Sequence, residues 1–164
     1  MEQACETLEF FCLTEEELNV EAVMKTVMHA SAGAALLFLG TVRQFTHGRE
    51  TLQLRYEAYP SMALRIMREI GEEIQCKWPG SEVAIHHRTG MLKIGEIAVL
   101  IAVSCPHRRE AYEASQYAIE QVKSRLPIWK QEYAPDGTFW VTSCCAHEGL
   151  TARPEHTETG EGRW

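Results

Sequence analysis

The sequence has 164 residues, of which 45% are hydrophobic and 24% charged, a composition that fits one globular domain. Its net charge of −7 argues against a general nucleic-acid binder or a protein of anionic membrane surfaces, and no apolar run approaches the roughly 20 residues needed to cross a bilayer. Acidic residues stand at the N-terminus where a secretory signal would carry basic ones, so we expect a cytoplasmic protein.

The first third of the chain predicts a helix followed by two strands. Thr14 and Glu17 fit the first and last positions of a capping box, which predicts a helix reaching about residue 30. Gly33 opens the apolar run 34–39, which is typical of a buried strand, and alternating apolar residues over 52–58 indicate a half-buried strand. The apolar face expected for the helix consists of Leu18, Ala22, Val23 and Val27.

The middle of the chain predicts a second helix and two further strands. Pro60 ends the preceding strand, and Ser61 is the expected cap of a helix that runs to about residue 78. Residues 83–88 are strand-like and turn at Thr89-Gly90, and residues 97–103 form another candidate for a buried strand. The core face predicted for the second helix consists of Ala63, Ile66, Met67, Ile70 and Ile74.

The last third predicts a helix and a hairpin. Pro106 fits the first turn of a helix that continues to about residue 126, and residues 128–141 resemble a hairpin closed at Pro135-Asp136-Gly137. The element order predicts an α+β fold with helices packed on a largely antiparallel sheet, one domain over residues 1–146, and a polar, disordered tail over 147–164. The third helix's predicted core face is Ala111, Ala114, Ala118, Ile119 and Val122.

The six cysteines form no CxxC pair, and no group of cysteines and histidines has the spacing of a zinc site, so we expect no metal. Free thiols in a reducing compartment are the favoured interpretation, and a strained disulfide between adjacent Cys144 and Cys145 is the alternative. Adjacent His86 and His87 point to opposite faces of a strand and cannot chelate one metal together; a packed, structural role is favoured for each.

An anion site is indicated near the start of the third helix. Residues 41–130 carry thirteen basic residues against ten acidic ones, although both ends of the chain are acidic. His107 and Arg108 stand where a helix N-terminus already favours an anion, and guanidinium grips phosphate in a bidentate manner. A solvated basic turn is the alternative for this segment taken alone.

Two lysines flank the end of the same helix. Lys123 closes the helix and Lys130 starts the hairpin, with Pro127 turning the chain between them, so both ammonium groups can reach one pocket. Such a pair suits proton transfer or stabilisation of a developing oxyanion. Two surface lysines are the alternative from the spacing alone. Arg43 follows a strand and a glycine and can reach the same pocket, whereas no P-loop, Rossmann glycine pattern or Ser-His-Asp arrangement supports another chemistry.

Taken together, ordered motifs over about residues 33–141 resemble the MoaE-type large subunit of molybdopterin synthase. Its most specific stretch runs from Lys123 to the Pro127-Ile128-Trp129-Lys130 sequence. The other matching stretches are Phe38-Leu39-Gly40-Thr41-Val42-Arg43, Tyr56-Glu57-Ala58-Tyr59, Met62-Ala63, Lys77-Trp78-Pro79, His87-Arg88-Thr89-Gly90, Gly95-Glu96, and His107-Arg108.

The resemblance implies an α/β-hammerhead-type domain with an added subdomain. It also implies sulfur transfer to cyclic pyranopterin monophosphate from the thiocarboxylated Gly-Gly terminus of a small, ubiquitin-like MoaD-type carrier. Two large subunits and two carriers form a heterotetramer in this family, residues of both large subunits line the pocket, and no metal or organic cofactor is needed.

Residue by residue, the resemblance makes Lys123 and Lys130 the catalytic-site lysines. It assigns Arg43, His107 and Arg108 to the anion pocket and Phe38 to its vicinity. Some family members carry a basic residue just after the final hairpin, where this chain has none. A docking module that has lost sulfur transfer is the second hypothesis, but it predicts loss of Lys123 or of the His107-Arg108 pair. A phosphate-ester hydrolase would need a nucleophile or metal set that the sequence does not offer.

Overall fold

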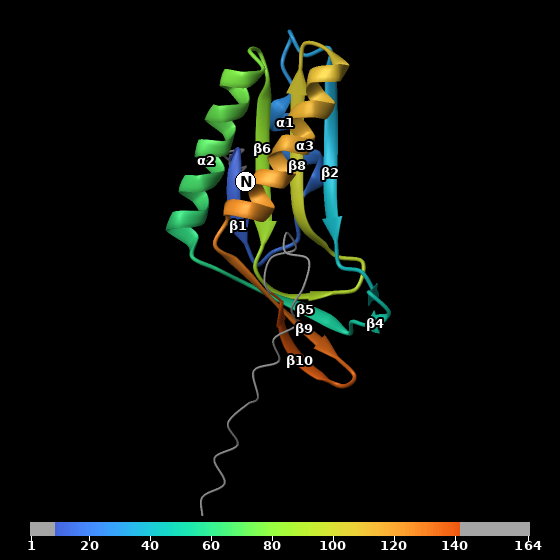
Figure 1. Ribbon diagram of the computed structural model, residues 1–164. Coiled ribbons are helices and arrows are strands. Elements are labelled where there is room, and N and C mark those ends of the chain that lie inside the picture. The colour runs from blue at the N-terminus through green and yellow to red at the C-terminus, as the bar shows by residue number, and fades with distance from the viewer. Residues whose placement is uncertain (1–8, 142–164) are drawn as a thin grey trace, which may run out of the picture.

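The computed structural model describes residues 9–141 (Figure 1). Within them, the helices are α1 (Val20–Val27), α2 (Pro60–Lys77) and α3 (Arg108–Arg125). The strands are β1 (Phe11–Thr14), β2 (Ala34–Thr41), β3 (Phe45–Thr46), β4 (Arg49–Glu50), β5 (Gln53–Ala58), β6 (Glu82–Arg88), β7 (Gly90–Lys93), β8 (Ile97–Cys105), β9 (Ile128–Ala134) and β10 (Gly137–Val141). No helix in this part of the chain is long and apolar enough to span a membrane. The predicted tail, residues 147–164, lies outside the described residues.

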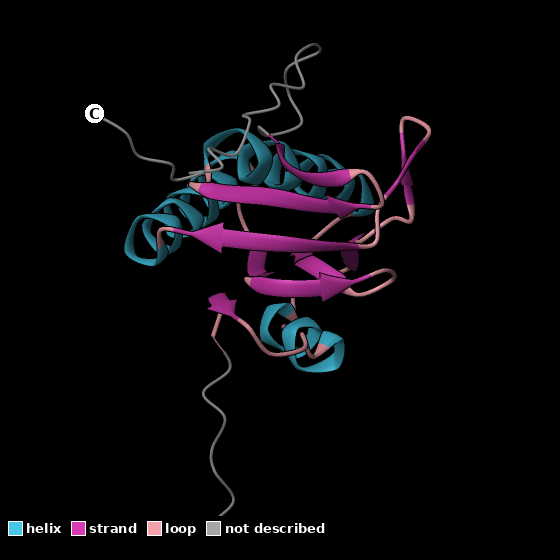
Figure 2. Ribbon diagram, turned by 90° about the horizontal axis from the view of Figure 1, so that it is seen from below, coloured by secondary structure: helices cyan, strands magenta, loops and turns pink. Residues whose placement is uncertain are grey.

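The main sheet has the strand order β1-β6-β8-β2. β1 runs parallel to β6, and the remaining neighbours are antiparallel. Helices α2 and α3 cover one face of this sheet, and α1 covers the other (Figures 1 and 2). Because β8 is covered on both faces, nearly all of its side chains are buried, as its continuous apolar sequence predicts. The predicted α+β architecture is confirmed.

Alternating side chains of the central strands supply two cores, one on each face. Ile85 of β6 and Ile101 of β8 face the helices α2 and α3, whereas Ala84 and Leu100 face α1. The predicted core face of α2 is confirmed, since all five of its residues are buried. The predicted face of α3 is buried except for Ile119, which is partly exposed.

A second sheet, in the order β10-β9-β5-β7, is antiparallel throughout and lies at one end of the main sheet (Figure 1). Leu54 and Leu92 of this sheet pack with Val42 and Ala98, which joins it to the main sheet. The β9–β10 hairpin closes where predicted, and Gly137 takes a φ of 141°, which favours glycine. The short β3–β4 ladder and β7 were not predicted.

The first helix begins later than the capping-box prediction. Thr14 belongs to β1 and pairs with Arg88, and its Oγ1 accepts a hydrogen bond from the Glu16 N–H at 3.0 Å. The residue that caps α1 is Asn19, whose Oδ1 accepts from the Ala22 N–H at 3.0 Å. The prediction was wrong because strand pairing of Thr14 with β6 outweighs a local cap.

Three smaller predictions, two on where helices begin and one on the burial of β2, are corrected by the structure. Pro60 is already inside α2, so Ser61 is not its cap, and α3 begins at Arg108, so Pro106 precedes the helix. β2 is an edge strand rather than a buried one. Its Leu37 and Leu39 side chains are 40% and 43% exposed, because α1 covers β6 and β8 but not β2.

Candidate active site

A cavity of about 140 Å³ lies at the end of α3, where the main sheet meets the second sheet. Lys123 and Lys130 both line it, together with Tyr56 and His87. The rest of its wall is apolar and comes from β8, from α3 and its C-cap, and from β9 and β10, through Val99, Ile119, Val122, Leu126, Ile128 and Val141. The structure therefore brings the two predicted lysines to one small, largely apolar cavity.

A short connection sets the positions of the two lysines. α3 ends at Arg125 and β9 starts at Ile128, so the chain reverses within two residues. The Pro127 carbonyl in this turn accepts a hydrogen bond from the Tyr59 N–H at 3.1 Å, which ties the turn to the start of α2. Because proline cannot continue the helix, the sequence itself forces the reversal that puts Lys123 and Lys130 on one cavity.

Lys130 is paired with a buried carboxylate that the sequence analysis did not single out. Its Nζ lies 2.9 Å from Glu132 Oε1, and the two side chains are only 19% and 9% exposed. Residues i and i+2 of a strand share a face, so β9 presents both groups to the same side of the sheet. The pair keeps the ammonium in place and offsets its charge, whereas Lys123 is exposed on the last turn of α3. The Lys-x-Glu spacing of a strand was the available signal.

His87 supplies the buried polar wall of the cavity. Its Nδ1 lies 2.7 Å from the Arg88 carbonyl oxygen, and its ring meets the Tyr56 ring edge-on with centroids 5.1 Å apart. Burial lowers the pKa of the imidazole from 6.5 to about 4, and the backbone hydrogen bond offsets this only in part. The ring is therefore neutral near pH 7. His86, on the opposite face of β6, lies against the Glu9 carbonyl instead.

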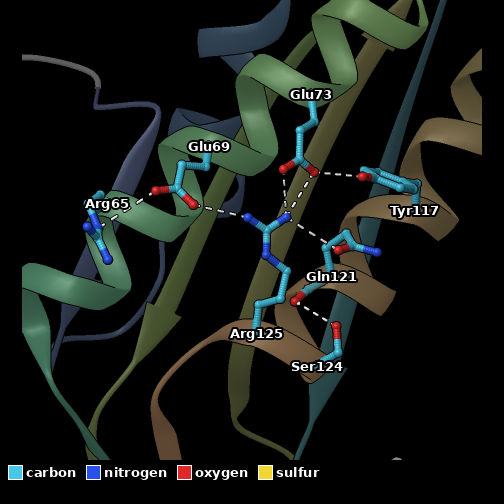
Figure 3. Close-up of polar contacts among 7 residues, drawn as sticks. All are labelled: Arg65, Glu69, Glu73, Tyr117, Gln121, Ser124 and Arg125. Carbon is cyan, nitrogen blue, oxygen red and sulfur yellow. Dashed lines mark hydrogen bonds and ion pairs between the residues drawn. The ribbon is translucent and has the colours of Figure 1, made fainter.

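An ion-pair network holds the end of α3 against α2 (Figure 3). Arg125 donates to both carboxylate oxygens of Glu73 at 2.8 and 2.9 Å and to Glu69 at 3.0 Å. The Tyr117 hydroxyl donates to Glu73 at 2.6 Å, and this bond, followed by those from Arg125, lowers the pKa of the Glu73 carboxyl. Since Arg125 lies two residues beyond Lys123, the network fixes the helix turn that carries the lysine.

None of the remaining predicted site residues lines this cavity within one chain, Arg43 included. Arg43 is exposed just beyond β2, at the end of the main sheet that faces the cavity. Phe38 packs partly buried against the core beneath α3 and is not part of the cavity wall. His107 and Arg108 are exposed at the start of α3. Arg108 precedes Lys123 by fifteen residues. At 1.5 Å per residue, about 22 Å of helix separates them from the lysine.

The His107-Arg108 turn is held by a close backbone contact. The Gly33 N–H donates to the Cys105 carbonyl at 3.0 Å, and a Cβ at Gly33 would collide with the Pro106 carbonyl oxygen. This contact explains the glycine before β2 and places the start of α3 beside the start of β2. His107 occupies the N-cap position without a side-chain cap bond, so its side chain is available to a ligand.

Neither metal nor disulfide chemistry is evident in residues 9–141. No group of three potential metal-ligating side chains lies together there. Cys12, Cys76 and Cys105 are free thiols, and burial raises the pKa of Cys105 to about 11, which leaves it unreactive. The adjacent Cys144 and Cys145 lie outside the described residues.

A family model described as MoaE protein matches residues 13–125, which is more than half of the chain. The chain belongs to the MoaE family. A relative from Halalkalibacterium halodurans, named molybdopterin synthase catalytic subunit, is 52% identical over 131 residues, which cover 80% of this chain and 84% of the relative. The expected family resemblance is confirmed.

Solved structures share the fold. The crystal structure of molybdopterin synthase from Staphylococcus aureus superposes with a TM-score of 0.79 at 45% identity, covering 81% of this chain and 97% of that one. A chain from the complex of subunits 1 and 2 of the molybdopterin-converting factor of Helicobacter pylori is 19% identical, with a TM-score of 0.68 and coverage of 80% and 90%. At that identity the likeness concerns the fold alone. Lys130 lies beyond the family-model match but within the described hairpin.

Proposed function

We propose that this chain is the catalytic subunit of a cytoplasmic molybdopterin synthase. In this proposal it is a sulfurtransferase that moves sulfur from the thiocarboxylated C-terminus of a small carrier protein to cyclic pyranopterin monophosphate. The observation that carries the proposal is the convergence of Lys123 and Lys130 on one small cavity. The relatives' shared name, molybdopterin synthase catalytic subunit, supports the same activity.

The cavity's size favours a slim protein tail as its occupant. Small-molecule pockets usually enclose about 300–1,000 Å³, and this cavity is only about 140 Å³. A Gly-Gly terminus has no side chains and fits a small, largely apolar cavity that two lysines line. The pterin then lies at the cavity mouth, and Arg43, exposed at this end of the main sheet, is available to its phosphate.

The chemistry proposed for the lysines follows from their surroundings. The carrier's thiocarboxylate sulfur attacks a carbon of the pterin side chain and forms a C–S bond. The C–O bond between that carbon and the cyclic phosphate breaks, which opens the ring, and negative charge develops on the departing phosphate oxygen. Within residues 9–141 no carboxylate forms an ion pair with Lys123 as Glu132 does with Lys130, so Lys123 stabilises this charge or donates a proton to it. Lys130, held by Glu132, binds the carrier's terminal carboxyl oxygen. Water then cleaves the acyl–sulfur bond, releasing the carrier as a carboxylate, and a second carrier supplies the second sulfur.

We further propose that a second copy of the chain completes the site. One chain holds the lysines and Arg43 at one end of the main sheet and His107-Arg108 at the other. A phosphate bound by His107 and Arg108 of the same chain would lie about 22 Å along α3 from Lys123. The two groups of cations act on one substrate only if another copy brings its own His107 and Arg108 to the cavity mouth.

The free edge of β2 offers a geometry for that pairing. β2 ends the main sheet, so its outer backbone groups can pair with another strand. Antiparallel pairing with β2 of a second copy would place the start of one strand beside the end of the other. Since α3 starts beside the start of β2, the second copy's His107 and Arg108 would then come near Arg43 and Lys123. A two-fold axis normal to the sheet keeps both α3 helices on the same face.

Mixing two impaired variants tests the shared site. Lys123→Ala and Arg108→Ala chains, each impaired alone, are unfolded together, refolded and assayed with carrier and substrate. In an equal mixture half of the dimers are mixed, and each mixed dimer has one site with all its cations. At pterin concentrations well below the KM, where Arg108→Ala is also impaired, we expect the mixture to exceed the average of its two parents by nearly a quarter of wild-type activity, on the order of 20%. A mixture no more active than its parts would place all the cations in one chain's site.

The proposed activity itself is tested by reconstitution. Purified chain, thiocarboxylated carrier and cyclic pyranopterin monophosphate are combined, and molybdopterin is assayed. Product that requires both the carrier and the chain supports sulfur transfer. Carrier binding without product would favour a docking module that has lost the chemistry.

A further inference from the structure

The cavity wall offers two cations but few hydrogen-bond acceptors for a bound peptide tail. Its two cations suit a carboxylate or thiocarboxylate, and its apolar wall suits methylene groups. A peptide tail also brings backbone N–H groups, which need an acceptor once they leave water. The neutral polar side chains on the wall are Tyr56, which is only partly buried, and His87, which is buried and is therefore the candidate acceptor.

The tautomer of His87 follows from its hydrogen bond. The Arg88 carbonyl oxygen can only accept, so the His87 Nδ1 at 2.7 Å must carry the hydrogen. In a neutral ring this leaves Nε2 without a hydrogen and able to accept. Within residues 9–141 no hydrogen-bond partner is found for Nε2, although the side chain is only 6% exposed and lines the cavity.

We infer that His87 is a carrier-binding residue whose Nε2 accepts a hydrogen bond from the backbone N–H of the carrier's terminal glycine. This inference rests on the proposed function and adds to it a specific contact for the carrier tail. The edge-on contact with Tyr56 and the bond to Arg88 hold the ring in one orientation, so the acceptor is in place before the tail enters. The bond directs the terminal thiocarboxylate towards Lys123 and Lys130.

Two substitutions at His87 separate the acceptor from the packing. His87→Phe keeps an aromatic ring against Tyr56 but removes both nitrogens, whereas His87→Gln can donate to the Arg88 carbonyl and still offer an acceptor. His86→Phe is the matched control, because that ring lies on the opposite face of β6. Binding of the carboxylate form of the carrier is measured by calorimetry, and turnover is measured with the thiocarboxylate form.

We expect His87→Phe to weaken carrier binding about 5- to 150-fold, the range for leaving a buried N–H unpaired. The KM for carrier should rise by a similar factor, with a smaller change in kcat, and His87→Gln should recover most of the loss. His86→Phe should bind carrier as wild type does. Equal affinity in wild type and His87→Phe, or a loss in His87→Phe that His87→Gln does not recover, would overturn the inference.

A carrier whose terminal glycine is replaced by sarcosine, which lacks the N–H, tests the bond from the other side. Wild type should bind this carrier more weakly than the natural one, whereas His87→Phe should discriminate little between them. Equal discrimination by wild type and His87→Phe would contradict the assignment. If His87→Phe does not fold, His87→Leu, which also lacks the acceptor, takes its place in this comparison. If wild type binds the natural carrier and makes product, failure of these tests removes only the role of His87; if it does neither, the proposed function fails first.

Discussion

The buried imidazole of His87 makes the stability of the protein depend on pH in a defined direction. Burial lowers its pKa from 6.5 to about 4, so the folded state resists protonation where the unfolded chain accepts it. The contribution of the neutral His87 ring to the free energy of unfolding is fully present above pH 6.5, and it is lost as the pH falls towards 4. Below that value both states are protonated and no further loss from His87 follows.

The size of this effect follows from the two pKa values. The difference between 6.5 and about 4 corresponds to about 3 kcal/mol in the free energy of unfolding when the whole window is crossed. Between pH 7 and pH 5, where the carboxylates are still largely ionised, the part due to His87 is about 2 kcal/mol. That is a large fraction of the 5–15 kcal/mol typical of a domain's stability.

Urea unfolding of wild type and His87→Phe at pH 7 and pH 5 measures the effect. The wild-type free energy of unfolding should fall by about 2 kcal/mol more than that of the variant over this interval. His86 and the surface groups titrate in both proteins, so their contributions cancel in the comparison. The same decline in both proteins would refute the account of a neutral, buried His87.

Three further predictions concern the network at the end of α3, the phosphate site and the free sheet edge. Arg125→Ala should lower the free energy of unfolding by about 1–2 kcal/mol, less at high salt, whereas Arg65→Ala, which removes a more exposed pair, should cost under about 0.5 kcal/mol in the same urea titrations. Arg108→Ala should raise the KM for the pterin several-fold in steady-state assays while carrier binding is unchanged; an unchanged KM would remove it from the phosphate site. Leu37→Asp should give monomers by analytical ultracentrifugation with an unaltered circular dichroism spectrum, since like charges would face each other across paired β2 strands.

Elements with strong local patterns were predicted correctly from the sequence. The apolar stripe of α2, the buried run of β8 and the Pro135-Asp136-Gly137 turn depend on the periodicity or turn chemistry of their own residues. The capping box at Thr14 failed because β1 pairs with β6, a partner far along the chain. The exposure of Leu37 could not be predicted either, since it depends on which strands α1 covers.

The candidate site was predictable in part for the same reasons. Lys123 and Lys130 flank the turn at Pro127, so the sequence near this turn is enough to predict that both lysines line one cavity. The role of His87 depends on the second sheet closing over the end of β6, which no local pattern shows. The predicted helix length already implied about 22 Å between Arg108 and Lys123, but the sequence analysis drew no conclusion from it about whether one chain can bring them together.

The most direct test of the account compares carrier binding and single-turnover product formation in Lys123→Ala and Lys77→Ala. Lys77 is the matched control, because it also lies in the last turn of an 18-residue helix but does not line the cavity. We expect Lys77→Ala to resemble wild type and Lys123→Ala to bind the carrier while forming no molybdopterin. Product formation by Lys123→Ala at the wild-type rate would contradict the claim that sulfur transfer takes place at this cavity.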